Sequence, residues 1–495
     1  MLDSIKSTLK NTAIYSIGNL SVKLVGIVLL PFYTNPHYLT IDAYGALGLF
    51  EAINQILVIV LGLGLYNSLI RWYYDIKSEK EQKELVFSIW VGTALATIPI
   101  TILILLFNRP LTHLTFGNDK YTYEFTLLLI GTALQVIGMI PMALMRMQEK
   151  AGLYTTSNVV RLGTMLAATL ILLLYFKRGL AGILEAQIIG NVAYFIVITP
   201  YSLRNISFRF RPSLFRPLLS YGVPIMFAAL ASIALTTVDR FIINGFYGLD
   251  QVSLYSLGVK VANVVKVFII GSVSLALSPM IFKKMNDPDN KRFYSKAMTY
   301  YGFGIMICIL FLSLFAQEAI KVLASSTYYW KAFGIVPVIA FSFYFSALRD
   351  VAVTGIHLTK KTRILTAITF TTAIVNLILN FALIPWLKSM GAAIALSFSQ
   401  FFFFVASYFF SQRQYHVPYE ISKLIKMFLV GVGLFFLGYL CSGLHLWLRL
   451  TLKLLLIMSF PFLLYPFNFY EPIELQRIGE IWRKWRNPLG WPIFK

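Results

Sequence analysis

Long apolar stretches separated by short polar loops run along almost the whole chain. Fourteen are long enough, or nearly so, for the ~20 residues that a helix needs to cross a bilayer. They lie at about residues 12–34, 43–70, 85–107, 122–145, 153–176, 180–200, 218–247, 252–281, 297–316, 333–355, 364–384, 390–411, 427–445 and 448–468. The pattern predicts an all-α polytopic membrane protein with about 14 transmembrane helices and no loop long enough to form a separate domain.

Two neighbouring stretches, 218–247 and 252–281, interrupt this apolar pattern with charges. The first carries Asp239 and Arg240, and the second carries Lys260, Asn263 and Lys266 at spacings of three. Residues three apart on a helix lie near one another, so the last three form one slanting polar stripe. An isolated cation at the centre of a bilayer costs on the order of 2.5–3.5 kcal/mol or more, so this stripe is expected to face a bundle interior or a water-filled path.

Similar residues recur about 210 positions apart. The offset is 209 to 211 residues for four pairs: Tyr44 and Tyr255, Asn54 and Asn263, Lys150 and Lys360, Gly182 and Gly391. Six helices per repeat give two halves of parallel orientation, with a cavity between them near the bilayer midplane. The expected domains are an N-terminal lobe at 1–205, a C-terminal lobe at 206–412, two extra helices at 413–470 and a cytoplasmic amphipathic basic tail at 471–495. The alternative for the tail is a simple basic stop after the last span.

Composition supports a membrane protein. Hydrophobic residues make up 58% of the chain and charged residues 13%, with a mean hydropathy of +0.72. The two cysteines lie in apolar stretches and suggest no disulfide framework or metal site. The net charge of +22 reflects topology, because 28 of the 43 basic residues fall in the N-terminus, the even-numbered loops and the tail. Both termini are therefore predicted to be cytoplasmic, and no nucleic acid is expected as a partner.

Several short motifs occur in a characteristic order along the chain: Tyr44-Gly45, Tyr221-Gly222-Val223-Pro224, Asp239-Arg240-Phe241-Ile242-Ile243, Tyr255 with Lys260, Gly391-Ala392-Ala393-Ile394-Ala395 and Tyr415-His416-Val417-Pro418-Tyr419. With these motifs the chain resembles the multidrug/oligosaccharidyl-lipid/polysaccharide exporter superfamily, specifically its polysaccharide-transporter branch of O-antigen flippases. The resemblance implies movement of an undecaprenyl-diphosphate-linked oligosaccharide from the inner to the outer leaflet of a bacterial plasma membrane.

A diphosphate head group that crosses the bilayer needs cations to replace its hydration. The candidates for a cationic cavity are five residues within spans: Lys23, Arg161, Lys260, Lys266 and Arg349. Arg161 and Arg349 have an alternative, in which they snorkel toward the cytoplasm or hydrogen-bond between helices. Arg349 is also expected to be partly neutralised by Asp350 or its neighbours, but only through a third helix or a water, because adjacent helical residues project about 100° apart. Arg240 is expected to be structural.

Other polar residues suggest sugar contacts and coupling. Asn54 and Asn263 are candidates to hydrogen-bond sugar hydroxyls. Three carboxylates in or near the outer halves of spans, Asp239, Glu51 and Glu185, are candidates for proton coupling or gating, because desolvation raises a carboxylate pKa. For Asp239 the alternative is a role as gate partner for Lys260 in the inward-facing state.

No cofactor, metal or enzymatic activity is expected, because the sequence has no metal-ligand cluster, phosphate-binding glycine loop or nucleophile motif; a proton or sodium gradient is the candidate energy source. Expected partners are the lipid-linked oligosaccharide, membrane lipids and a polysaccharide polymerase. Two alternatives remain open. A cation-coupled small-molecule exporter of the same superfamily would favour a cavity of carboxylates and aromatics, and a membrane glycosyltransferase or polymerase would usually need a sizeable outer loop.

Overall fold

The computed structural model describes residues 26–476, and these residues are helical with short connections and no strand. Twelve helical stretches among them are long and apolar enough to cross a membrane. They are α3 (Ile41–Gly62), α5 (Glu79–Leu106), α7 (Thr122–Met147), α8 with η1 (Ala151–Tyr175), α9 (Gly179–Arg204), η2 with α10 (Pro212–Tyr247), α11 with η3 and α12 (Leu249–Lys283), α13 (Asn290–Leu314), η4 with α15 and α16 (Thr327–Leu358), α17 (Thr362–Gln414), α18 with η5 (Ile421–Gly443) and α19 with η6 (Leu446–Phe467). The predicted all-α membrane fold is confirmed.

One predicted boundary differs from the structure. The stretch expected at 43–70 breaks at Leu63 and Gly64, which have φ angles of +46° and +69°, and continues as the short helix α4 (Leu65–Tyr73). The spans expected at 364–384 and 390–411 correspond to the two helices that α17 joins across a kink at Lys388, where φ is +54° and the backbone is not helical. The predicted span 12–34 lies mostly outside the described residues. The exact number of fourteen therefore stays a prediction.

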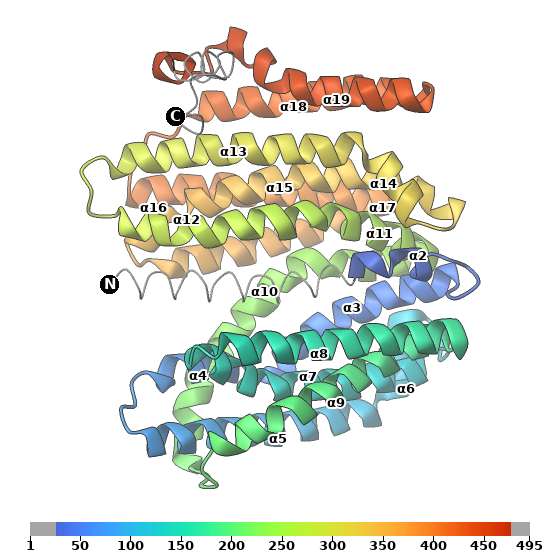
Figure 1. The fold of residues 1–495 in the computed structure, drawn as a ribbon, viewed down its shortest axis with the longest axis vertical. Helices are drawn as coiled ribbons and strands as arrows, with labels where there is room; N and C mark the ends of the chain where they lie inside the picture. Colours follow the sequence, from blue (N-terminus) through green and yellow to red (C-terminus); the bar gives the residue numbers. More distant parts are fainter. Residues whose placement is uncertain (1–25, 477–495) are drawn as a thin grey trace, which may run out of the picture.

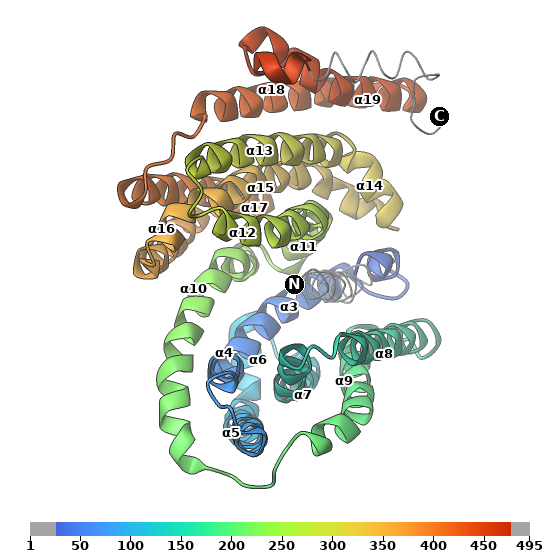
Figure 2. The same cartoon turned by 60° about the vertical axis from the view of Figure 1, so that its left-hand side comes forward.

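The helices form two bundles with a helix pair beside them (Figure 1). Helices α3, α5, α7, α8 and α9 pack together in one bundle, while α11, α13, α15 and α17 form the other. Helix α10 follows both bundles in turn, first along α4 and later along α17, and Figure 2 shows it as the long connection at the side of the molecule. Helices α18 and α19 pack on α13. The domain boundaries expected from the repeat stay predictions.

The backbone itself carries the repeat. Glu149 and Lys360 have φ angles of +53° and +58°, and Lys177 and Lys388 have φ angles of +50° and +54°. Each pair is separated by 211 residues, which matches the spacing of the sequence motifs. Non-glycine residues rarely adopt this left-handed conformation. Its recurrence at one offset in both halves therefore supports the internal repeat independently of the side chains.

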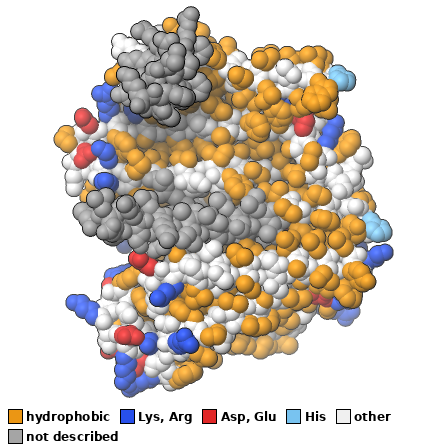
Figure 3. All heavy atoms as spheres, in the orientation of Figure 1, with side chains coloured by type: hydrophobic (Ala, Val, Ile, Leu, Met, Phe, Trp, Pro, Cys, Tyr) orange, Lys and Arg blue, Asp and Glu red, His pale blue; other side chains and the backbone are white. Residues whose placement is uncertain are grey.

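The exterior separates apolar and charged side chains. Figure 3 shows hydrophobic side chains across the middle of the molecule, with Lys and Arg gathered mainly at its left edge. The loops that connect α4 to α5, α9 to α10 and α12 to α13 lie toward this side in Figure 1, and their sequences include basic residues such as Lys77, Arg209 and Lys284. We call this edge the basic end. Most of its loop residues belong to the set that predicted a cytoplasmic face.

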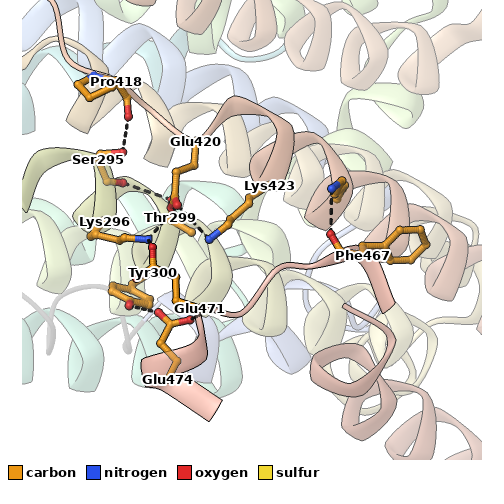
Figure 4. Close-up of polar contacts among 11 residues, drawn as sticks. Ser295, Lys296, Thr299, Tyr300, Pro418, Glu420, Lys423, Phe467, Glu471 and Glu474 are labelled. Atoms are coloured by element: carbon orange, nitrogen blue, oxygen red, sulfur yellow. Dashed lines mark hydrogen bonds and ion pairs between the residues drawn. The ribbon is translucent and has the colours of Figure 1, made fainter. Parts of the chain in front are cut away.

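A polar cluster at the basic end joins the helix pair to the second bundle (Figure 4). Lys296 of α13 forms ion pairs with Glu420, which precedes α18 (2.8 Å), and with Glu471, which follows α19. Glu420 also accepts hydrogen bonds from Thr299 and Lys423. Burial raises the pKa of Glu420, but these hydrogen bonds together outweigh it and hold the pKa below the usual glutamate range. The predicted tail helix beyond Leu475 lies almost wholly outside the described residues.

A second ion cluster fixes the same helix pair at the opposite end. Glu318, on the short helix α14 (Ala316–Leu323), pairs with Arg449 and Lys453 of α19, both at 2.8 Å. The side chain of Lys453 is 3% exposed. Buried charges are tolerated when they are paired, and one carboxylate here compensates two cations. These two clusters hold α18 and α19 against the second bundle at both ends.

Candidate functional site

The two bundles meet where α3 packs on α11. A Cβ added at Gly45 would overlap the backbone carbonyl of Leu249, and one added at Gly48 would overlap the Ser256 hydroxyl. These glycines therefore allow the two helices to approach closely. These contacts lie in the first half of each helix. In Figure 1 the first halves of α3 and α11 lie at the side of the molecule opposite the basic end. The junction thus closes the space between the bundles on the side opposite the basic end.

An ion pair spans this junction. Lys260 of α11 contacts Glu51 of α3 with an Nζ–Oε1 distance of 2.7 Å. The same ammonium group lies 5.3 Å from the ring centre of Tyr44 and 5.8 Å from that of Tyr33, within the range of cation–π attraction. The side chains of Lys260 and Glu51 are 19% and 37% exposed. The pair is therefore partly open to the space between the bundles, where a third charged group has access to it.

The main cavity, of about 430 Å³, lies next to this pair. Besides Lys260 and Glu51, its polar lining consists of Tyr33 and four uncharged side chains, and the remaining walls are apolar apart from Gly26. The four uncharged polar residues are Asn54, Thr169, Gln187 and Asn263. Thr132 donates a hydrogen bond of 2.6 Å to Asn54. The cavity thus offers one exchangeable ion pair and several amide and hydroxyl groups, which suits a ligand with an anion and many hydroxyls.

A smaller cavity of about 150 Å³, which we call the annex, lies on the other side of Asn263. Its cations are Arg240 and Lys266, and the amides of Gln55, Asn263 and Gln400 also line it. Lys266 begins the π-helical turn η3 (Lys266–Ile270), and its ammonium lies 5.7 Å from the ring centre of Phe343. Single π-turns within α-helices frequently occur at functional sites. Asn263 lines both cavities, so the polar stripe on α11 runs from one cavity to the other.

The other predicted cations do not share these cavities. Lys23 lies outside the described residues. Arg161, on α8, lines neither the main cavity nor the annex. Arg349, on α15, also lines neither, and it pairs directly with Asp350 at 2.9 Å. The expectation that this pair needs a third helix or a water was wrong, because the long arginine side chain bends back to its neighbour.

The three candidate carboxylates lie in different surroundings. Glu51 holds Lys260, whereas Glu185 pairs with Arg178 and accepts a hydrogen bond of 3.1 Å from Tyr123. Glu185 thus lies among surface partners and does not line the main cavity or the annex.

The expectation that Asp239 is the gate partner of Lys260 is wrong in this structure, where Glu51 takes that place. Asp239 is 3% exposed and accepts hydrogen bonds from the Tyr255 hydroxyl and from the backbone N–H of Arg240. Tyr255 and Lys260 are five residues apart on one helix, so their side chains project about 140° apart. Asp239 therefore faces a different side of α11 from the one that carries Lys260. Its role in proton coupling stays a prediction.

Some residues that line the two cavities were not identified from the sequence. Gln55, Gln187 and Gln400 line the two cavities but occur singly in apolar stretches. Arg240 was expected to be structural, yet it lines the annex. The signal that could have identified them is the high free-energy cost of placing any polar side chain in a bilayer-spanning helix. This cost applies to glutamine as well as to arginine.

Comparison with known proteins identifies the family of the chain. Residues 8–285 match the profile of a family described as polysaccharide biosynthesis protein. Among curated relatives, a putative O-antigen transporter of Shigella flexneri is 23% identical over 284 residues, covering 55% of this chain and 66% of the relative. A capsular polysaccharide biosynthesis protein, CapF of Staphylococcus aureus, is 26% identical over 206 residues, covering 40% of this chain and 50% of the relative. This chain thus spans less than two thirds of each relative's length.

Solved structures show the same fold. The lipid II flippase MurJ in an inward closed conformation has a TM-score of 0.74 with 18% identity, over 92% of this chain and 99% of MurJ. An inward-facing multidrug resistance transporter of the MATE family, in the MOP superfamily, has a TM-score of 0.66 with 15% identity, over 83% of this chain and 99% of the transporter. The fold resemblance expected from the sequence motifs is confirmed. With more than half of its length matched by the family profile, the chain belongs to the polysaccharide biosynthesis protein family.

Proposed function

We propose that this protein is a flippase that moves an undecaprenyl-diphosphate-linked oligosaccharide from the inner to the outer leaflet of a bacterial plasma membrane. The family membership and the MurJ-like fold support a lipid-linked substrate. The observation that carries the proposal is the Lys260–Glu51 pair, which lies at the junction of the bundles and on the wall of the main cavity. In this proposal the termini and the basic end are cytoplasmic, and the substrate enters from that side.

Exchange of ion partners links substrate binding to movement of the bundles. When a diphosphate approaches Lys260, it competes with Glu51 for the ammonium group. Once the phosphate holds the lysine, α3 and α11 lose one of their direct attractions, and the junction opposite the basic end opens more easily. A ligand shifts a conformational equilibrium only by its different affinities for the two states, and this exchange supplies such a difference.

The uncharged lining gives the oligosaccharide its contacts. Asn54, Asn263 and Gln187 carry both hydrogen-bond donors and acceptors, so they match hydroxyl groups of many orientations. The apolar walls carry no charge that would hold the sugar too tightly for release. The lipid tail remains in the bilayer while the head group crosses through the cavity.

The energetics do not require a dedicated coupling ion. A membrane potential that is negative inside favours outward movement of an anion by about 2.3 kcal/mol per charge per 100 mV. Proton coupling through Asp239, or sodium coupling, remains a further proposal. A polysaccharide polymerase that uses the exported repeat unit is the proposed partner.

The test is restoration of surface polysaccharide in a flippase-deficient bacterium whose sugar pathway supplies a lipid-linked repeat unit. The native chain, Lys260→Met, Lys23→Ala and Lys266→Ala are compared at matched membrane abundance. We expect the native chain to restore polysaccharide and Lys260→Met to lose most of that activity, because the variant lacks the exchangeable cation. Arg413→Met, which removes an exposed arginine lying over Phe409, is the matched control.

Two results would contradict the proposal. One is full restoration by Lys260→Met, which would remove the ion-exchange step. The other is failure of the native chain with lipid-linked substrates from several sugar pathways, combined with export of organic cations by the purified protein in liposomes. That combination would favour a small-molecule exporter, whereas elongation of the lipid-linked repeat by purified protein would favour a polymerase.

A further inference from the structure

The annex contains a buried arginine that the surrounding protein does not neutralise directly. Arg240 is 5% exposed, and its Nε has no hydrogen-bond partner among the described residues. Among the described residues its guanidinium group forms no ion pair, although the neighbouring carboxylate of Asp239 attracts it electrostatically. The neighbouring Asp239 already accepts hydrogen bonds at both oxygens, from the Arg240 backbone and from Tyr255. A buried cation left in this condition is costly unless a ligand completes its contacts.

The other annex residues complement an oxyanion that carries hydroxyl groups. Lys266 supplies a second cation, and Gln55 and Asn263 supply amides. The Gln400 side chain is 8% exposed, and its Oε1 has no hydrogen-bond partner among the described residues. A planar arginine fork matches a carboxylate or phosphate, whereas amide groups match sugar hydroxyls. Both types of partner in one compartment indicate a charged carbohydrate group and not a simple inorganic ion.

The shape of the annex decides which part of a lipid-linked oligosaccharide fits. Its walls come from α3, α10, α11 with η3, α15 and α17, so helices surround it. A diphosphate lies between the lipid and the sugar, and the molecule continues on both sides of it. A compartment between helices accepts a free end more readily than a group in the middle of the molecule. The annex has about a third of the volume of the main cavity, so it takes a small group, on the scale of one sugar residue at most.

We propose that the annex is a subsite for a terminal acidic sugar of the transported oligosaccharide, with Arg240 binding its oxyanion and Gln400 and Asn263 binding its hydroxyls. The inference rests on the proposed flippase function and adds a substrate class to it. The main cavity holds the head group near Lys260, and the annex distinguishes oligosaccharides that end in an acidic sugar from those that end in a neutral one. The shared residue Asn263 places the two subsites next to each other along α11.

The test measures ligand-dependent thermal stability of the purified full-length chain. The probes are sodium glucuronate, glucose, sodium acetate and sodium pyrophosphate at equal ionic strength. We expect glucuronate to raise the unfolding temperature saturably. Glucose and acetate should raise it much less, because glucose has the hydroxyl groups without the carboxylate and acetate has the carboxylate without the hydroxyl groups. Arg240→Met should weaken apparent glucuronate affinity roughly tenfold or more, as expected for loss of a charge-assisted hydrogen bond. Gln400→Leu is the second variant and should also weaken it, and Arg413→Met should not.

Three results would overturn the inference. They are the absence of a glucuronate effect, an unchanged effect in both Arg240→Met and Gln400→Leu, and an Arg240-dependent pyrophosphate effect stronger than that of glucuronate. The last result would assign the annex to the diphosphate. Because binding is measured without transport, flipping without glucuronate binding would refute this inference alone. Glucuronate binding without flipping of any lipid-linked oligosaccharide would refute the proposed function alone.

Discussion

Replacing Glu51 with glutamine tests the exchange of ion partners most sharply. The variant Glu51→Gln keeps the size of the side chain but removes the charge that competes with substrate for Lys260. Coulomb attraction at the observed 2.7 Å has an upper limit of about 6 kcal/mol at an effective dielectric constant near 20. Glu51 is 37% exposed, so the net contribution lies between about 1 kcal/mol for a surface pair and about 3–5 kcal/mol for a buried one.

A value of about 2 kcal/mol corresponds to roughly a 30-fold change in an equilibrium constant. We therefore expect Glu51→Gln to bind pyrophosphate roughly 30-fold more tightly than the native chain, measured by titration calorimetry on purified protein. In cells the same variant should flip more slowly, because the bound anion is released less easily. Glu79→Gln removes a carboxylate from an exposed ion pair with Lys83 and is the matched control. Unchanged or weaker pyrophosphate binding by Glu51→Gln would refute the competition between carboxylate and phosphate.

Three further perturbations test how the fold is held together. Glu318→Gln leaves two buried cations without their carboxylate and should lower the free energy of unfolding by about 3–5 kcal/mol, measured as a lower unfolding temperature. Adding Lys453→Met should restore part of this lost stability. Gly45→Ala should push α3 away from α11 and destabilise the junction by about 1–3 kcal/mol, whereas Gly245→Ala meets nothing within 4 Å and should be silent. The lowered pKa of Glu420 contributes stability above the ordinary glutamate pKa of about 4.3, and that contribution should be lost as the pH falls through the folded-state pKa, measured as a drop in unfolding temperature.

Each of these has a clear contrary result. An unfolding temperature of Glu318→Gln equal to that of the native chain would show that water already neutralises the cluster. Equal effects of the two alanine variants would show that the α3–α11 contact is loose. If the unfolding temperature of Lys296→Met falls with acid as it does in the native chain, the polar cluster at the basic end does not cause the pH effect.

The apolar pattern predicted most of the fold because a bilayer-spanning helix needs a fixed length of apolar residues. It missed the break at Gly64, since a single glycine in an apolar stretch does not reveal a positive φ angle. It did separate the two helices of α17, which meet at the non-helical residue Lys388. The apolar pattern shows which residues can lie in the bilayer, but it does not show the backbone angles at which a helix breaks.

The candidate site was predicted only in part. The stripe of Lys260, Asn263 and Lys266 does face interior cavities, because polar groups on a spanning helix avoid lipid. The partner of Lys260 could not be predicted, since Glu51 lies on another helix and the crossing of α3 and α11 fixes which residues meet. Arg240 was assigned a structural role because it lies near the predicted outer end of its span, next to Asp239. Only the observed geometry shows that this carboxylate faces Tyr255.

We propose that the protein flips a lipid-linked oligosaccharide through a cavity controlled by Lys260. The most direct measurement reconstitutes the purified full-length chain in liposomes that contain undecaprenyl-diphosphate-linked oligosaccharide and follows access of the sugar to an external lectin. We predict rapid exposure with the native chain, little exposure with Lys260→Met and native behaviour with Arg413→Met. Equal exposure rates for the native chain and for empty liposomes, with the protein folded and the substrate matched, would contradict the claim.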